Sequence, residues 1–231
     1  MTPMTSRWII LFLLLIPGLV SAAIAPLGSN DIAQARSYGT NSLLTFRALV
    51  TPANFQLLGF HSTNEVLQVT NAEPIPVYTV ILAQLQNYHP GDPISGLLEL
   101  PSRVIVPLML GTDVRSSITL RLVPGGAAAP GTQGVWTTEN WGQPKLIRDL
   151  IATYRMIPSA DVRPGTKPFA VEIPVFDIWL IGYYDTQNEL VLRSTVDLRL
   201  GQLTVFRHEF VTEAAVVRLS NAALRYNGLP N

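Results

Sequence analysis

The feature that most constrains the fold is a strict alternation of side chains in residues 190–200. Leucine or valine recurs at every second position except Ser194, and the residues between include Arg193, Asp197 and Arg199. A period of two places alternate side chains on opposite faces of a β-strand, one packed and one in water. The chain is therefore predicted to build a sheet that has a solvated face.

Further strands are predicted wherever runs rich in valine, isoleucine and leucine lie between Gly, Pro or Asp. A turn is predicted at Gly111-Thr112-Asp113, and a hairpin at residues 185–188 joins the long apolar run of residues 169–184 to the alternating strand. The remaining predicted strands are residues 66–69, 77–85, 96–100, 104–110, 117–123 and 203–210.

Two amphipathic helices are predicted from apolar stripes at helical spacing. The first covers residues 144–156, begins at Pro144 and must end before Pro158. The second covers residues 213–226. Thr51-Pro52 also has the pattern of a helix start, which predicts a short helix over residues 52–58, whereas residues 23–42 show no periodicity and are interpreted as a lead-in segment.

These elements predict an α+β fold, mainly antiparallel sheet with the two amphipathic helices on one face, and an all-β sandwich is the alternative. Ile75-Pro76-Val77-Tyr78 and Ile173-Pro174-Val175-Phe176 match at an offset of 98 residues, so two related halves are a further hypothesis. The small-residue stretch 124–134 is the predicted flexible boundary between a β-rich first half, residues 23–123, and an α+β second half, residues 135–231.

The N-terminus has the pattern of a secretory signal peptide over residues 1–22. Arg7 precedes an apolar run over residues 8–20, and Val20-Ser21-Ala22 offers small residues for a signal peptidase. The run is shorter than the ~18 residues usually needed to span a bilayer. Cleavage after Ala22 would release a periplasmic or extracellular protein; an uncleaved segment would anchor the domain to the membrane.

Composition excludes several chemistries. Only 14% of the residues are charged, 48% are hydrophobic and the formal net charge is zero. The chain is therefore predicted to have a well-filled core and no nucleic-acid partner, since it lacks the excess of cations that phosphate binding requires. With no cysteine, disulfide, zinc-thiolate and iron–sulfur sites cannot form.

Catalytic motifs are missing, and no cofactor or metal site is predicted. The chain contains no Gly-x-Ser-x-Gly elbow and no phosphate-binding glycine motif, and His208-Glu209 lacks the second histidine of a zinc helix because position 212 is threonine. Asp177, Asp185 and His208 are the weak catalytic candidates. Asp177 interrupts an apolar run. Two interpretations of this position remain open, a buried and hydrogen-bonded aspartate or a functional carboxylate.

The candidate binding residues are Trp136, Trp141 and the Glu139 between them, beside the 124–134 segment. Exposed aromatic residues next to a loop form recognition surfaces, although tryptophans in such places also seal the edge of a core.

The function predicted from these patterns is that of an exported, non-catalytic protein that binds another envelope or secreted protein or assists envelope assembly. The first alternative is a carboxylate-dependent hydrolase of the cell envelope. The second is a signal-anchored subunit of an envelope complex, and only this alternative involves the membrane.

Overall fold

The computed structural model describes residues 27–124, 134–195, 198–200, 203–206 and 211–226. The predicted signal peptide, most of the 124–134 segment and His208 lie outside these residues.

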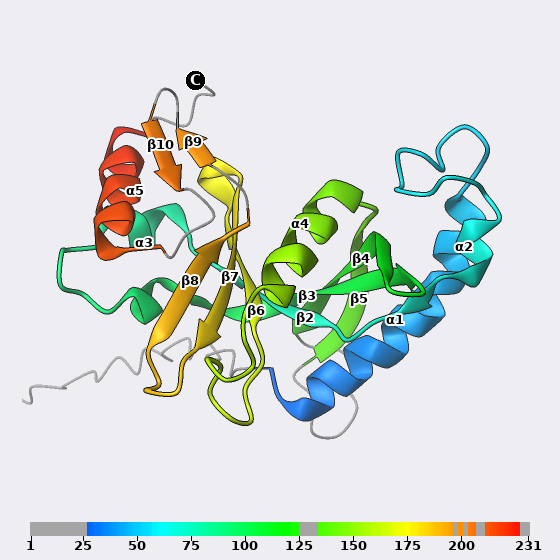
Figure 1. The fold of residues 1–231 in the computed structure, drawn as a ribbon, viewed down its shortest axis with the longest axis horizontal. Coiled ribbons are helices and arrows are strands. Elements are labelled where there is room, and N and C mark those ends of the chain that lie inside the picture. The colour runs from blue at the N-terminus through cyan, green and yellow to red at the C-terminus, as the bar shows by residue number, and fades with distance from the viewer. Residues whose placement is uncertain (1–26, 125–133, 196–197, 201–202, 207–210, 227–231) are drawn as a thin grey trace, which may run out of the picture.

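One mixed sheet forms the centre of the molecule (Figure 1). Its strands lie in the order β5-β4-β3-β2-β6-β7-β8, and β1 pairs with β3. All neighbours are antiparallel except β2 and β6, which are parallel. The strands are β1 (Thr70–Asn71), β2 (Ile75–Thr79), β3 (Glu99–Leu110), β4 (Asp113–Pro124), β5 (Gly134–Trp141), β6 (Phe169–Ile173), β7 (Ile178–Tyr184) and β8 (Leu190–Ser194). A separate hairpin pairs β9 (Leu198–Leu200) with β10 (Leu203–Phe206).

Helices cover both faces of this sheet. The helices are α1 (Ser29–Leu49), α2 (Glu65–Gln68), α3 (Leu82–Gln86), α4 (Pro144–Arg155) and α5 (Glu213–Arg225), with 3-10 turns at Ile94–Leu97 and Pro174–Phe176. On the first face, α1 packs over β3 to β5, and α3 and α5 pack over β6 to β8. The second face packs α4 over the central strands, as Figure 1 shows.

The two faces follow directly from alternation along the strands. On β3, Val104, Val106 and Leu108 point into the core beneath α1, whereas Ile105 points into the core beneath α4. A strand buried on both sides carries a continuous apolar run rather than an alternating one. This is why residues 104–110 have no polar position.

The α+β prediction is confirmed, with a mostly antiparallel sheet and one parallel pair. The described residues form one large sheet with helices on both faces, together with the small β9–β10 hairpin, so they do not form the alternative all-β sandwich. The helix predicted at residues 144–156 is α4 and the helix predicted at residues 213–226 is α5. The expectation that both cover one face is wrong, because α4 packs on one face of the sheet and α5 on the other. The hairpin turns predicted after β3 and after β7 are also present.

Helices α1 and α2 correct the sequence interpretation. Residues 29–49, mostly assigned to a lead-in, form a helix of 21 residues. Its buried face includes Ala35, Gly39 and Ser42, and such small side chains leave no apolar stripe in the sequence. The predicted strand at residues 66–69 is wrong because α2 covers most of it.

Further predictions needed correction. Residues 96–100 divide between the 3-10 turn at Ile94–Leu97 and the start of β3, which continues through residues 104–110 as one strand. The strand predicted at residues 190–200 ends at Ser194 as β8, and Leu198–Leu200 forms β9 of the separate hairpin.

Residues 52–58 form successive turns rather than a helix. Residues 77–85 divide into the end of β2 and most of α3, with Ile81 as the N-cap of that helix. The apolar run of residues 169–184 is two antiparallel strands, because the 3-10 turn at Pro174–Phe176 reverses the chain.

The matching Ile-Pro-Val segments lie in different structures. Ile75 to Tyr78 belong to β2, whereas Ile173 ends β6 and Pro174–Phe176 forms the 3-10 turn. One sheet also includes strands from both sides of the 124–134 segment, since β5 pairs with β4 and β6 pairs with β2.

Candidate functional site

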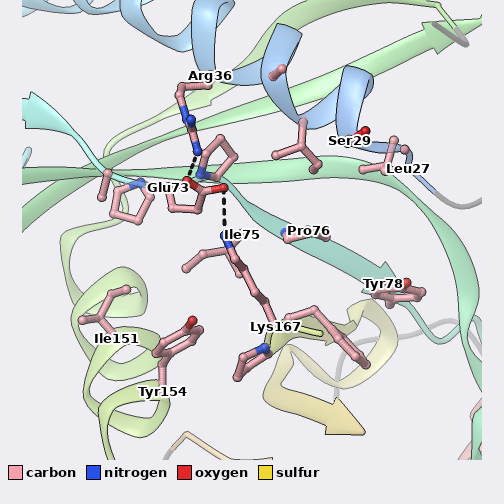
Figure 2. Close-up of a pocket in the computed structure, with 18 of the residues that line it drawn as sticks. Leu27, Ser29, Arg36, Glu73, Ile75, Pro76, Tyr78, Ile151, Tyr154 and Lys167 are labelled. Carbon is pink, nitrogen blue, oxygen red and sulfur yellow. Dashed lines mark hydrogen bonds and ion pairs between the residues drawn. The ribbon is translucent and has the colours of Figure 1, made fainter. Parts of the chain in front are cut away.

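A cleft of about 600 Å³ opens where the parallel strands β2 and β6 begin. The first turns of α1 form one wall, the last turns of α4 form another, and the segment leading into β6 closes the third side (Figure 2). A cavity of this size is typical of ligand sites, which range over roughly 300–1,000 Å³.

Prolines explain why the sheet opens at this point. Pro74 and Pro76 lie at the start of β2, and Pro168 comes directly before β6. Proline has no backbone N–H and cannot donate to a strand ladder. The parallel pairing accordingly starts only at Val77 and Ala170, and the chain segments before it separate. All three prolines line the cleft that results.

A cluster of three charged side chains lies inside the cleft. The Arg36 guanidinium, from α1, donates to the Glu73 carboxylate, and Lys167 Nζ lies 3.3 Å from Glu73 Oε1. Figure 2 shows Glu73 between these two cations. The exposed fractions are 54% for Arg36, 41% for Glu73 and 69% for Lys167. The cluster has one positive charge in excess and remains accessible to solvent.

Aromatic rings form the other end of the cleft. The Tyr78 and Phe169 rings lie 4.5 Å apart between centroids, and Tyr184 packs behind Phe169 at 6.0 Å. Gly182 makes this packing possible because a Cβ there would lie 2.4 Å from the Phe169 ring. Burial, with a smaller contribution from the neighbouring Tyr184, raises the pKa of Tyr78 above its ordinary value. This end is therefore an apolar, neutral surface.

A second, smaller cavity of about 280 Å³ shares Tyr154 and Lys167 with the cleft. It adds Arg163, whose guanidinium donates to the side-chain oxygen of Asn188. Among the described residues that line the two cavities, the cations are Arg36, Arg163 and Lys167, and the acid is Glu73.

The aromatic residues predicted to bind a partner pack against the rest of the molecule. Trp136 is 2% exposed, and its Nε1 donates to the backbone carbonyl of Asp31 on α1 at 3.0 Å. Trp141 is half-buried and stacks on Phe46, with ring centroids 5.6 Å apart. The expectation of an exposed recognition pair is wrong for Trp136, because its ring completes the core under α1.

Glu139 pairs with arginines of the same sheet face. Its carboxylate lies 3.9 Å from Arg103 and 3.8 Å from Arg121. Arg103 also bonds Thr79 on β2 and Glu172 on β6, so the network extends from β5 across β4, β3 and β2 to β6. Glu139 therefore has charged partners within the molecule.

The two catalytic candidates that the structure describes, Asp177 and Asp185, lie in separate turns. Asp177 is exposed, not buried in a strand, and adopts φ of 51° in the turn after β6. Asp185 Oδ1 accepts the backbone N–H groups of Gln187 and Glu189, at 2.9 and 2.8 Å, and so closes the β7–β8 hairpin. The third candidate, His208, lies outside the described residues. Both aspartates thus have positions explained by turn geometry.

The described part of the chain contains no cluster of three His, Asp or Glu that could hold a metal ion. Within the same residues, none of the helices combines the length and apolar character that crossing a bilayer demands. Searches against protein-family models, curated proteins and solved structures gave no match to this chain.

Sequence reasoning did not identify the cleft. Arg36, Glu73 and Lys167 come from three separate segments, and each is an ordinary charged residue in its own context. The available clue was proline, since Pro74, Pro76 and Pro168 interrupt apolar runs at the ends of predicted strands.

Proposed function

We propose that the chain is an exported, non-catalytic binding protein that holds part of another envelope or secreted protein in the cleft at the start of β2 and β6. The observation that carries this proposal is the accessible Arg36–Glu73–Lys167 cluster inside an apolar cavity of about 600 Å³. Sites for ligands are concave, largely apolar and provided with a few polar groups that fix orientation.

The structure of the walls supports binding rather than a purely structural void. Apolar surface comes from Leu27, Ile32 and Ile151, while Tyr78 and Tyr154 add rings with polar ends. Tyrosine and arginine are enriched where proteins meet, because they combine contact area with hydrogen bonding. The cleft therefore offers both a surface to bury and charges to orient a ligand.

The hydrolase alternative draws less support from the geometry. Asp177 is exposed in a turn. Asp185 is half-buried, but its carboxylate accepts two backbone N–H groups that close the β7–β8 hairpin, which gives it a structural role. The described residues that line the cleft include a single carboxylate, that of Glu73.

The proposal is tested with two matched tryptophan variants of α1. Ala33 lines the cleft, whereas Ala48 is an exposed residue further along the same helix. Ala33→Trp should fill the cleft and abolish capture of the partner from envelope extract, while Ala48→Trp should capture as well as the unmodified protein. Equal capture by both variants would reject the cleft as the binding site.

Export is tested by the mass of the N-terminus in protein isolated from the source cells. An N-terminus at Ala23 is the expected result. A mass that retains residues 1–22 would instead favour the signal-anchored alternative.

A further inference from the structure

We propose that the cleft selects an acidic segment of its protein partner, with the carboxylates of that segment on Arg36 and Lys167 and its apolar side chains against the proline and tyrosine walls. This inference rests on the proposed function and names the chemistry of the ligand.

Charge complementarity is the first argument. The two adjacent cavities are lined by Arg36, Arg163 and Lys167 against Glu73, which leaves two positive charges in excess. The whole chain is neutral, with 16 basic and 16 acidic residues. The positive excess is therefore a local property of the cleft, and complementary charge governs which partner a surface accepts.

The second argument is the position of Glu73. Its carboxylate contacts both Arg36 and Lys167, which come from α1 and from the segment before β6. One carboxylate thus already occupies the place where a ligand carboxylate would bind. All three side chains are substantially exposed, so exchange of one carboxylate for another costs little, because exposed ion pairs contribute only about 0–1 kcal/mol.

The third argument concerns the shape of the lined surface. The second cavity lies beside the cleft, since Tyr154 and Lys167 line both, and Arg163 lines the second cavity. Cations therefore line two adjacent cavities rather than a single point. An extended peptide with several acidic residues matches this arrangement better than a small ligand with one carboxylate.

The test uses fluorescently labelled peptides of one length that share their apolar residues and differ only in carrying Glu, Gln or Lys at the other positions. Binding to the full chain is followed by fluorescence anisotropy at low and at physiological salt. The Glu peptide should bind about tenfold more tightly than the Gln peptide and should weaken as salt rises. The Lys peptide should not bind.

Two variants locate the effect, and a third controls for net charge. Lys167→Gln should weaken binding of the Glu peptide about threefold to tenfold, and Glu73→Gln should strengthen it by a similar factor because both cations are released. Arg218 is an exposed arginine on α5, outside both cavities, so Arg218→Gln should leave the affinity unchanged.

The remaining outcomes overturn the inference in distinguishable ways. Equal affinity for the three peptides, abolished by Ala33→Trp, would keep the cleft as a peptide site but reject acidic selection. Preference for the Lys peptide would make Glu73 the recognition group. If no peptide binds while anionic phosphatidylglycerol vesicles do, and Lys167→Gln removes that binding, the ligand is a lipid headgroup. Failure of Ala33→Trp to affect partner capture would reject the proposed function itself.

Discussion

The edge strand β5 and the cleft carry similar residues but use them differently. Both combine aromatic rings, a glutamate and cations. On β5, Trp136 is 2% exposed and Glu139 pairs with arginines of the sheet. In the cleft, Arg36 and Lys167 are more than half exposed although Glu73 joins them. Residue type alone therefore does not separate a packing edge from a binding surface; solvent access does.

The position of Glu139 also has a structural explanation. Thr138 pairs with Leu120 and Asn140 pairs with Thr119, so Glu139 is the additional residue of a β-bulge. Bulges and charged residues on edge strands discourage pairing with other chains. We infer that Glu139 protects the edge of the sheet, whereas Glu73 belongs to the candidate binding site.

The largest expected effect comes from truncating the β5 aromatic residue. Trp136→Ala should lower the free energy of unfolding by about 3–5 kcal/mol, because it leaves a cavity under α1 and removes the bond to Asp31. Urea denaturation measures this change. The control is Val135→Ala, since Val135 is 40% exposed on the same strand. A loss below about 1 kcal/mol for Trp136→Ala would contradict the core assignment.

The next effect concerns the arginine network beneath Glu139. Arg103 and Glu172 have exposed side-chain fractions of only 19% and 16%. Arg103→Ala should destabilise the fold by about 2–3 kcal/mol, because a largely buried carboxylate loses its partner. Arg121 is 60% exposed, and Arg121→Ala should cost under about 1 kcal/mol. Equal losses in urea denaturation would remove the distinction between these two arginines.

The charged residues of the cleft should contribute much less than Arg103 to the free energy of unfolding. Lys167→Gln should change the free energy of unfolding by less than about 1 kcal/mol, since its pair with Glu73 is exposed. The same substitution should weaken ligand binding. A large loss of stability, seen as a lower urea midpoint, would show that Lys167 stabilises the fold. The charged residues of the cleft would then be structural, like those of the network at Glu139.

The smallest effect is expected at alkaline pH. The pKa of Tyr78 is raised in the folded state, mainly by burial. As pH rises above about 10, the unfolded chain ionises this tyrosine while the folded chain still holds the proton, so stability falls. Below that pH the two states do not differ at this group.

Tyr78→Phe should make the alkaline loss of stability less steep without abolishing it, because burial also raises the pKa values of Tyr88 and Tyr183. Thermal unfolding at several pH values, with tyrosinate absorbance as a second readout, measures the effect. An unchanged pH dependence in this variant would indicate that Tyr78 is not shielded at the end of the cleft.

The sequence predicts those elements whose own side chains form a pattern. Helix α4 buries Ile147 and Leu150 at helical spacing and was predicted correctly. The alternating strand predicted at residues 190–200 is correct only for β8, which ends at Ser194, because Leu198–Leu200 forms β9 of the separate hairpin. Helix α1 was missed because small residues make up part of its buried face; a Cβ added at Gly39 would lie 3.2 Å from Val106. That close approach comes from the tertiary fold and leaves no local periodicity.

The candidate site depends even more on the fold. Glu73 and Lys167 are separated by 94 residues in the chain, and the parallel pairing of β2 with β6 brings their segments together. No spacing rule relates residues across such a connection. The division of residues 169–184 into two strands also depends on the tertiary fold, because the turn at Pro174–Phe176 depends on the pairing of β6 with β7.

The central claim is that the partner meets the protein at the cleft and not at β5. The most direct test places a photo-crosslinking amino acid either at Ala33 in the cleft or at Val135 on β5, in otherwise unmodified full-length protein. Our account predicts that the captured partner crosslinks from position 33 and not from position 135. Crosslinking from position 135 alone would contradict it and would return the binding surface to the edge strand.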